Sequence, residues 1–158
     1  MTVLNLPAGT QIITEEVVDN ALATQGLNKQ TITEITIPES VTEIGEYAFK
    51  GCESLTTVTL HDGVTKIGRS AFSECTSLSS IVIPENVTEI DGYAFRECTS
   101  LSSIVMPENV TEIGRSAFEG CESLSSIVIP KNVTVISSKA FCSCEGLTTV
   151  TLHNGVTK

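Results

Sequence analysis

The sequence predicts a right-handed α/β solenoid, with a parallel β-sheet on one face and short extended segments and single helical turns on the other. Three observations predict this fold. Phe occurs only at positions 49, 72, 95, 118 and 141, always 23 residues apart. Ala precedes each Phe, and Cys follows it three residues later. Each 23-residue unit also contains alternating apolar residues, which is the period of a half-buried strand.

The units predict how the chain is organised. Residues 1–31 resemble a degenerate, lengthened first unit, which we expect to cap the array, and residues 32–158 form the repeats. The predicted repeats span residues 32–54, 55–77, 78–100, 101–123, 124–146 and, as a partial unit, 147–158.

The unit 78–100 shows the first predicted element. Its start reads LSSIVI, in which Ile81 and Ile83 alternate with polar or outward residues, so we expect a strand there. Pro84 follows, and it ends the strand because proline cannot donate to a sheet ladder.

The rest of the unit predicts two further elements. Val87 and Ile90 lie three apart, which indicates a second short extended segment or a tight turn. Ala94, Phe95 and Cys98 share one face of a helical turn. One unit alone cannot bury these apolar residues, but stacked units form a continuous core with strands roughly 4.8 Å apart.

The two ends of the chain depart from the repeat. Thr14 suits a helix N-cap, the acidic Glu15 and Glu16 suit the first turn, and Gly26 suits the end of the helix. We expect this helix to cap the solenoid. At the other end, residues 148–152 predict a strand with no sequence left to cover it, so we expect either a longer array or self-association through this end.

The repeat resembles a known family. The segment LSSIVMPEN, residues 101–109, matches the LxxLxLxxN pattern of leucine-rich repeats, and its continuation VTEIG with AF and Cys121 is similar to the BspA-like subclass. The similarity covers residues 32 to the end. The Asn column departs from the pattern, since it also holds Ser40, Gly63 and Gly155. The resemblance implies a bacterial cell-surface or secreted protein that binds other proteins or takes part in adhesion.

Composition excludes several classes of protein. The formal charge is −10, which argues against nucleic acid and anionic membranes as partners. No run of about 18 apolar residues is present, so we expect no membrane insertion. Residues 1–9 lack the basic and apolar regions of an export signal. The family resemblance favours the cell surface, whereas unpaired cysteines favour a reducing cytosol or an anaerobic setting.

Five cysteines form one column of the repeat: Cys52, Cys75, Cys98, Cys121 and Cys144. We interpret them as small buried apolar residues in preference to a disulfide or metal framework. Stacked at roughly 4.8 Å, their Cβ atoms lie slightly outside disulfide range, and zinc needs four ligands that converge on a point. Cys142 is different, because its column otherwise holds Lys, Ser, Arg and Glu. It is the candidate exposed thiol, unless it is a chance substitution.

Other polar columns offer no catalytic or metal site. His61 and His153 replace the turn proline four coils apart, too distant for a catalytic pair, so we interpret them as turn residues. The acidic columns, such as Glu85 with Glu108, are interpreted as a solvated face in preference to a calcium site. The three Asn-Val-Thr sequons, which begin at Asn86, Asn109 and Asn132, fall in the family's structural Asn column, so we expect backbone-bonding turn residues.

The strand face that points away from the core is the candidate binding face. It is small, nearly uncharged and mildly apolar, on a chain that is otherwise strongly acidic. The same composition also suits any strand, because Val and Thr favour strands. Its residues are Thr57, Thr59, Ser80, Val82, Ser103, Val105, Ser126 and Val128.

The sequence therefore predicts a non-enzymatic protein-binding module without cofactors, whose protein partner is unidentified. The alternative is a structural spacer within a longer surface protein. An enzyme is disfavoured, because a repeat arranges its polar groups in rows, whereas catalysis needs them to converge in a pocket.

Overall fold

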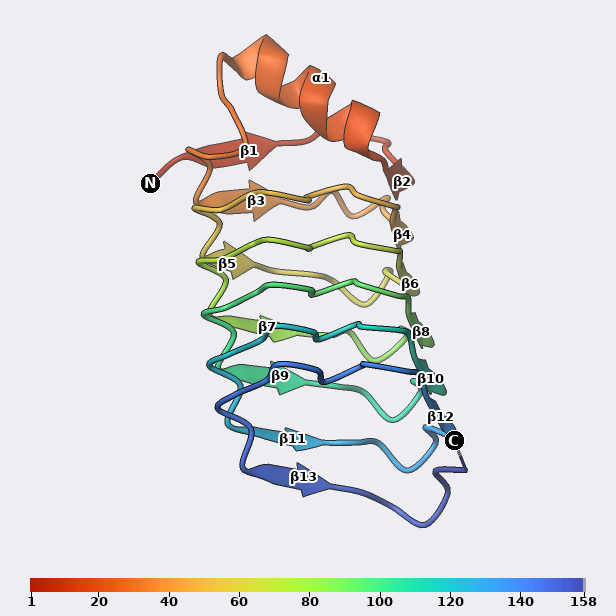
Figure 1. Ribbon diagram of the computed structural model, residues 1–158. Coiled ribbons are helices and arrows are strands. Elements are labelled where there is room, and N and C mark those ends of the chain that lie inside the picture. The colour runs from red at the N-terminus through yellow and green to blue at the C-terminus, as the bar shows by residue number, and fades with distance from the viewer. Residues whose placement is uncertain (158) are drawn as a thin grey trace.

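The chain forms a parallel β-solenoid in the computed structural model, which describes residues 1–157 (Figure 1). The coils stack along one axis, and each contributes one strand to a front face. The first six coils also contribute one short strand each to a second face. Partner strands are aligned one repeat apart, so that Ser80 pairs with Ser103 and Glu89 pairs with Glu112. The predicted solenoid is confirmed.

The front face consists of seven parallel strands, one from each coil. They are β1 (Val3–Asn5), β3 (Glu34–Thr36), β5 (Thr57–Val58), β7 (Ser80–Val82), β9 (Ser103–Val105), β11 (Ser126–Val128) and β13 (Thr149–Thr151). The hydrogen-bonded ladder is not continuous. It joins β1, β3 and β5, then β7 with β9, then β11 with β13. The front face is therefore interrupted between β5 and β7 and between β9 and β11.

The second face is uninterrupted. Its strands are β2 (Ile12–Ile13), β4 (Glu43–Ile44), β6 (Lys66–Ile67), β8 (Glu89–Ile90), β10 (Glu112–Ile113) and β12 (Val135–Ile136). They form one sheet of six strands in chain order. This sheet keeps the coils in register, even where the front face opens.

The predicted helical turn takes the form of consecutive tight turns. In the coil around Phe95, the amides of Ala94 and Cys98 donate to carbonyls three residues back, at 3.3 and 3.2 Å. The amide of Phe95 instead donates to Ala117 of the next coil at 2.8 Å. Tyr93 and Glu97 have positive φ angles of 61° and 60°, which interrupt any α-helix. The turns are thus bonded to the neighbouring coil, and no α-helix forms.

A column of stacked phenylalanines forms the centre of the core. Phe49, Phe72, Phe95 and Phe118 are fully buried, and successive ring centroids lie 5.4 Å apart. The rings from Phe72 onward are parallel within 5°, in the spacing that offset stacking favours. Because every coil supplies the same ring at the same place, one packing solution serves the whole stack.

Helix α1 (Glu15–Gln25) lies across the first coil (Figure 1). Thr14 accepts the amide of Val17 at 3.2 Å, and Gly26 ends the helix with a φ of 65°, as the sequence predicts for both caps. The side chain of Gln25 bonds the backbone of Asn5 through both its nitrogen and its oxygen, at 2.8 and 3.2 Å. These bonds partner the outer edge of β1, which would otherwise be open. The division at residue 31 remains a prediction.

The positive-φ turns predict a stabilising substitution. Ser143 has a φ of 57°, and its column holds glycine at Gly51 and Gly120. Ser143→Gly should raise the free energy of unfolding by about 1 kcal/mol, because glycine adopts this conformation without the strain of a Cβ atom. Urea denaturation measures the change. Ser143→Ala is the matched control, and an equal gain in both variants would contradict the prediction.

Candidate binding face

The candidate face is a strip of outward-pointing side chains on β5, β7, β9 and β11. We call it the front strip: Thr57, Thr59, Ser80, Val82, Ser103, Val105, Ser126 and Val128, all of which are exposed. The alternation of the strands explains this, since Ile81 and Ile127 between them are buried. The side chains of Val82, Val105 and Val128 remain 65, 60 and 60% exposed, so one apolar column of the strip faces solvent.

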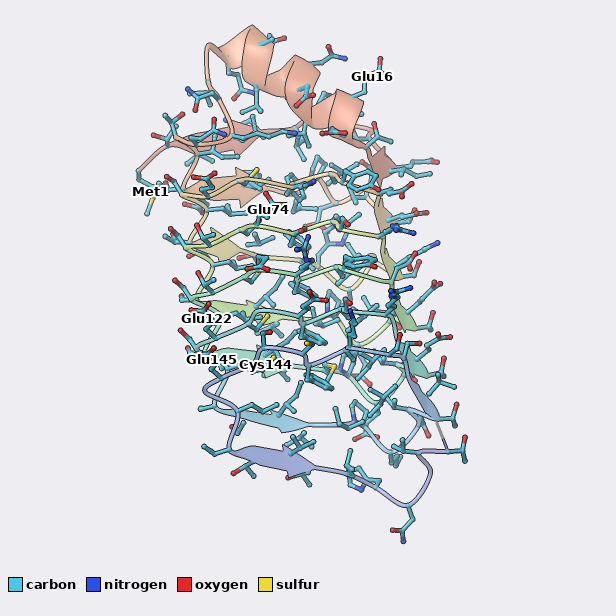
Figure 2. The ribbon with its side chains drawn as sticks, in the orientation of Figure 1. Met1, Glu16, Glu74, Glu122, Cys144 and Glu145 are labelled. Carbon is cyan, nitrogen blue, oxygen red and sulfur yellow. The ribbon has the colours of Figure 1, made fainter. Side chains whose placement is uncertain are left out.

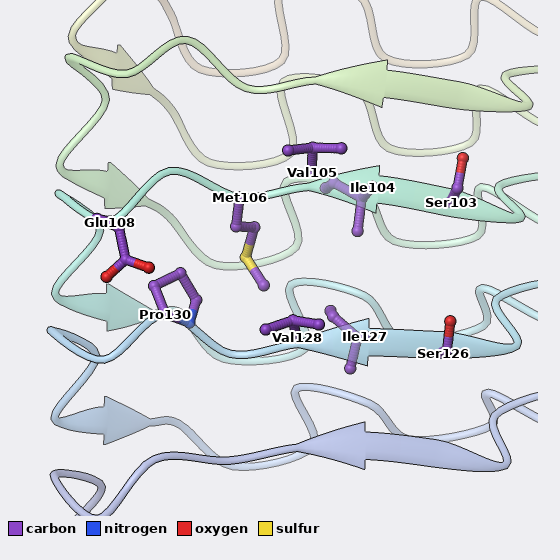
Figure 3. A pocket seen from close by; sticks show the side chains of 9 residues that line it. All are labelled: Ser103, Ile104, Val105, Met106, Glu108, Ser126, Ile127, Val128 and Pro130. Atoms are coloured by element: carbon purple, nitrogen blue, oxygen red, sulfur yellow. The ribbon is translucent and has the colours of Figure 1, made fainter.

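A groove opens in the front strip where the ladder is interrupted between β9 and β11. We call it the β9–β11 groove; its volume is about 340 Å³ (Figure 3). It is lined by Ser103, Ile104, Val105, Met106, Glu108, Ser126, Ile127, Val128 and Pro130. This volume lies at the lower end of the range for ligand pockets in proteins. A smaller hollow of about 220 Å³ lies at the other interruption, between β5 and β7.

The floor of the β9–β11 groove reaches into the core. Ile104 and Met106 are only half-buried, whereas Ile81 and Ile83 occupy the same columns one coil earlier and are each 3% exposed. Figure 3 shows Met106 and Ile104 lying between the two strands. The groove therefore exposes apolar surface that the neighbouring coils bury.

The backbones of β9 and β11 are also not paired with each other across the groove. The amides of Ile83 and Ile129 donate across their strand pairs to Val105 and Thr151, at 3.1 and 2.9 Å. Among the described residues, no ladder joins β9 to β11. Main-chain donors and acceptors are thus available beside an apolar floor, a combination that suits a peptide.

The charges around the front strip are mainly acidic. Past the ends of its strands lies a column of exposed acids: Glu39, Asp62, Glu85 and Glu108. At the other edge, where the strands begin, lie Glu122 and Glu145 (Figure 2). The nearest cation is Lys131, whose Nζ is 3.9 Å from the Glu108 carboxylate. Most other cations lie on the tight turns: Lys50, Arg69, Arg96, Arg115 and Lys139.

The cysteine column is a packing element. The thiols of Cys75, Cys98 and Cys121 are buried, and each donates to the carbonyl of the Phe in the preceding coil, at 3.1 to 3.2 Å. Burial raises the pKa of Cys52 to about 12, and it also raises the pKa of Cys75, Cys98 and Cys121 well above the ordinary value of a thiol. No cysteine is paired in a disulfide, and residues 1–157 contain no cluster of His, Cys, Asp or Glu that could hold a metal.

The remaining polar columns serve the turns. His61 contacts the carbonyl of Pro38 at 2.9 Å through Nε2 and accepts the amide of Gly63 at 3.1 Å through Nδ1. The side-chain amides of Asn86, Asn109 and Asn132 each donate to a carbonyl of the preceding coil, at 2.7 to 2.8 Å. These side chains stabilise the turns, and the three asparagines are exposed on the surface.

Cys142 lies on the surface, on the tight-turn side of the solenoid and away from the front strip. In the folded protein, we expect a thiol-specific alkylating reagent to modify Cys142 first, because the thiolate is the reactive form and access is required. Cys144, half-buried with its pKa raised by burial, should follow slowly. Mass spectrometry after timed labelling measures this order; early labelling of Cys98 would contradict it.

The chain is similar to known bacterial proteins. Residues 22–158 match six copies of the BspA type leucine rich repeat region. A leucine rich repeat protein of T. pallidum is 38% identical over 78% of this chain and 59% of its own, with a TM-score of 0.74. A leucine-rich repeat protein of Bacteroides ovatus is 28% identical over 98% of this chain and 46% of its own, with a TM-score of 0.69.

A third structure, a leucine rich cell surface protein of Faecalibacterium prausnitzii, is 30% identical over 95% of this chain and 47% of its own, with a TM-score of 0.65. The chain thus spans about half the length of these structures. No curated protein matches it significantly. Within residues 1–157, no helix is long and apolar enough to cross a bilayer. On the match across residues 22–158, the chain belongs to the BspA type leucine-rich repeat family.

Proposed function

We propose that this chain is a non-enzymatic protein-binding module that engages its partner through the front strip. The observation that carries the proposal is the β9–β11 groove, where exposed valines, an open apolar floor and unpaired strand edges lie together. Repeat solenoids offer extended surfaces for binding. The leucine-rich repeat family of this chain typically serves as a scaffold without enzymatic activity. By analogy with the Faecalibacterium cell surface protein, we also propose that the chain acts at the cell surface. A role in adhesion or host interaction is the further proposal that the family resemblance implies.

A peptide selection tests this proposal. A display library of random linear peptides is selected on the wild-type chain and on a variant with Ser103→Lys and Val105→Lys. We expect enriched peptides to bind the variant at least about tenfold more weakly, because two ammonium groups would have to be desolvated in the groove. Both side chains are exposed, so the fold should survive, which circular dichroism checks.

The matched control places the same two charges on the second face. Thr88→Lys with Thr111→Lys alters exposed residues beside β8 and β10 and should leave binding unchanged. Equal binding by wild-type and the front-strip variant would contradict the proposal. A failure to enrich any peptide would instead favour the structural spacer.

The edge strand β13 carries a second proposal, that this 158-residue chain self-associates. Val150 and Leu152 are 44 and 55% exposed, and within residues 1–157 the strand β13 pairs with β11 alone. Exposed apolar edge strands recruit further strands. Light scattering should show a mass that rises with concentration, and Val150→Lys should reduce it; a strict monomer at high concentration would overturn this proposal.

A further inference from the structure

We propose that the segment bound in the β9–β11 groove is basic: a peptide stretch that inserts one large aliphatic or aromatic side chain and carries Lys or Arg beside it. This inference rests on the proposed function and adds the chemistry of the partner. It combines the shape of the groove with the distribution of charge around it.

The floor selects an apolar side chain. Ile104 and Met106 form its half-buried base, and Val105, Val128 and Pro130 stand around it. A side chain inserted there would cover apolar surface that water now contacts, which is favourable. Met106 adds adaptability, because its unbranched thioether can adjust to side chains of different shape.

The rim selects a cation. Of the nine residues that line the groove, Glu108 alone is charged. Its side chain is 54% exposed, and its contact with Lys131 at 3.9 Å is long, so the carboxylate is not engaged in a close ion pair. Its backbone carbonyl is held by Asn132 at 2.7 Å, which fixes the position of the rim.

The surroundings extend this preference beyond a single carboxylate. Glu85 lies in the same column one coil earlier, and Glu122 and Glu145 lie at the opposite edge of the front strip. With a net charge of −10, the molecule repels acidic partners as well. Complementary charge speeds encounter and suppresses wrong partners, so a basic segment is favoured over a neutral or acidic one.

The test uses the peptides enriched on wild-type protein and lost on the Ser103→Lys, Val105→Lys variant. We expect these groove-dependent peptides to be enriched in Lys and Arg next to a Leu, Met, Phe or Trp. For a synthetic copy of the most enriched sequence, Glu108→Gln should weaken binding about threefold to tenfold at low salt, and less at high salt.

A substitution of Lys131 should change the affinity in the opposite direction to Glu108→Gln. Lys131→Gln should strengthen binding of the same peptide, because it removes the cation that competes for Glu108. Glu89→Gln, on β8 of the second face, is the matched control and should change nothing. Groove-dependent peptides without basic residues, or insensitivity to both Glu108→Gln and Lys131→Gln, would overturn this inference and leave the proposed function standing. Peptides that bind independently of the groove would overturn the proposed function itself.

Discussion

Alkaline conditions should unfold this protein steeply, beginning near pH 9. Burial raises the pKa of four thiols above the ordinary value of 9.0: to about 12 for Cys52, and well above 9.0 for Cys75, Cys98 and Cys121. Above pH 9 the unfolded chain loses these protons while the folded chain keeps them. The contribution of the four thiols to the free energy of unfolding is therefore fully present at neutral pH and falls as pH rises above 9. The loss continues until the folded thiols ionise.

The magnitude of this effect is large because four thiols act together. Each thiol lowers the free energy of unfolding by about 1 to 1.5 kcal/mol per pH unit, so the four together lower it by roughly 5 kcal/mol per pH unit. Over two pH units, the loss therefore exceeds half of the free energy of unfolding of many domains. Urea denaturation at a series of pH values measures the slope.

A pair of variants isolates the thiols from other groups that titrate at high pH. Cys75→Ala with Cys98→Ala should roughly halve the slope, whereas Cys142→Ala, at an exposed site, should leave it unchanged. An unaltered slope in the double variant would show that the buried thiols are not the cause.

Phe95→Ala should destabilise the protein by about 3 to 5 kcal/mol. Phe95 is fully buried and stacks on Phe72 and Phe118, with centroids 5.4 Å away on either side. Its removal leaves a cavity and ends two stacking contacts at once, because the column cannot close without moving whole coils. Urea denaturation measures the loss.

Phe141→Ala is the control for position in the column. Phe141 is half-buried and stacks on Phe118 alone, so its removal should cost markedly less. Equal losses for Phe95→Ala and Phe141→Ala would show that stacking on both sides contributes nothing to stability.

The periodic features of the sequence predict most of the fold. The 23-residue spacing of Phe predicts the stacked rings, and the alternation around Ile81 predicts which side chains of β7 point outward. Thr14 and Gly26 predict the limits of α1. These predictions are correct because each depends on local sequence alone: either a pattern that recurs in every coil or a residue type that favours a helix end.

The tight turns show where local rules fall short. Ala94, Phe95 and Cys98 have the spacing of a helical turn, yet the amide of Phe95 donates to the next coil. That bond depends on Ala117, which is 22 residues away in the sequence. The turn also has positive φ angles at Tyr93 and Glu97, which the conformational preferences of these residue types do not predict.

The β9–β11 groove could not be predicted for a similar reason. Strands β7, β9 and β11 all read Ser-Ile-Val, but β7 pairs with β9 while β9 does not pair with β11. The one local signal is Met106, in a column that otherwise holds Ile or Leu. Whether adjacent coils close depends on the geometry of the whole stack, which identical strand sequences do not encode.

Hydrogen–deuterium exchange in the presence of a selected peptide tests the central claim most directly. If the partner binds the front strip, amides in residues 103–106 and 126–129 should become protected, while those of β6, β8 and β10 on the second face should exchange as before. Protection of the second face or of the tight turns, with the front strip unchanged, would contradict the account.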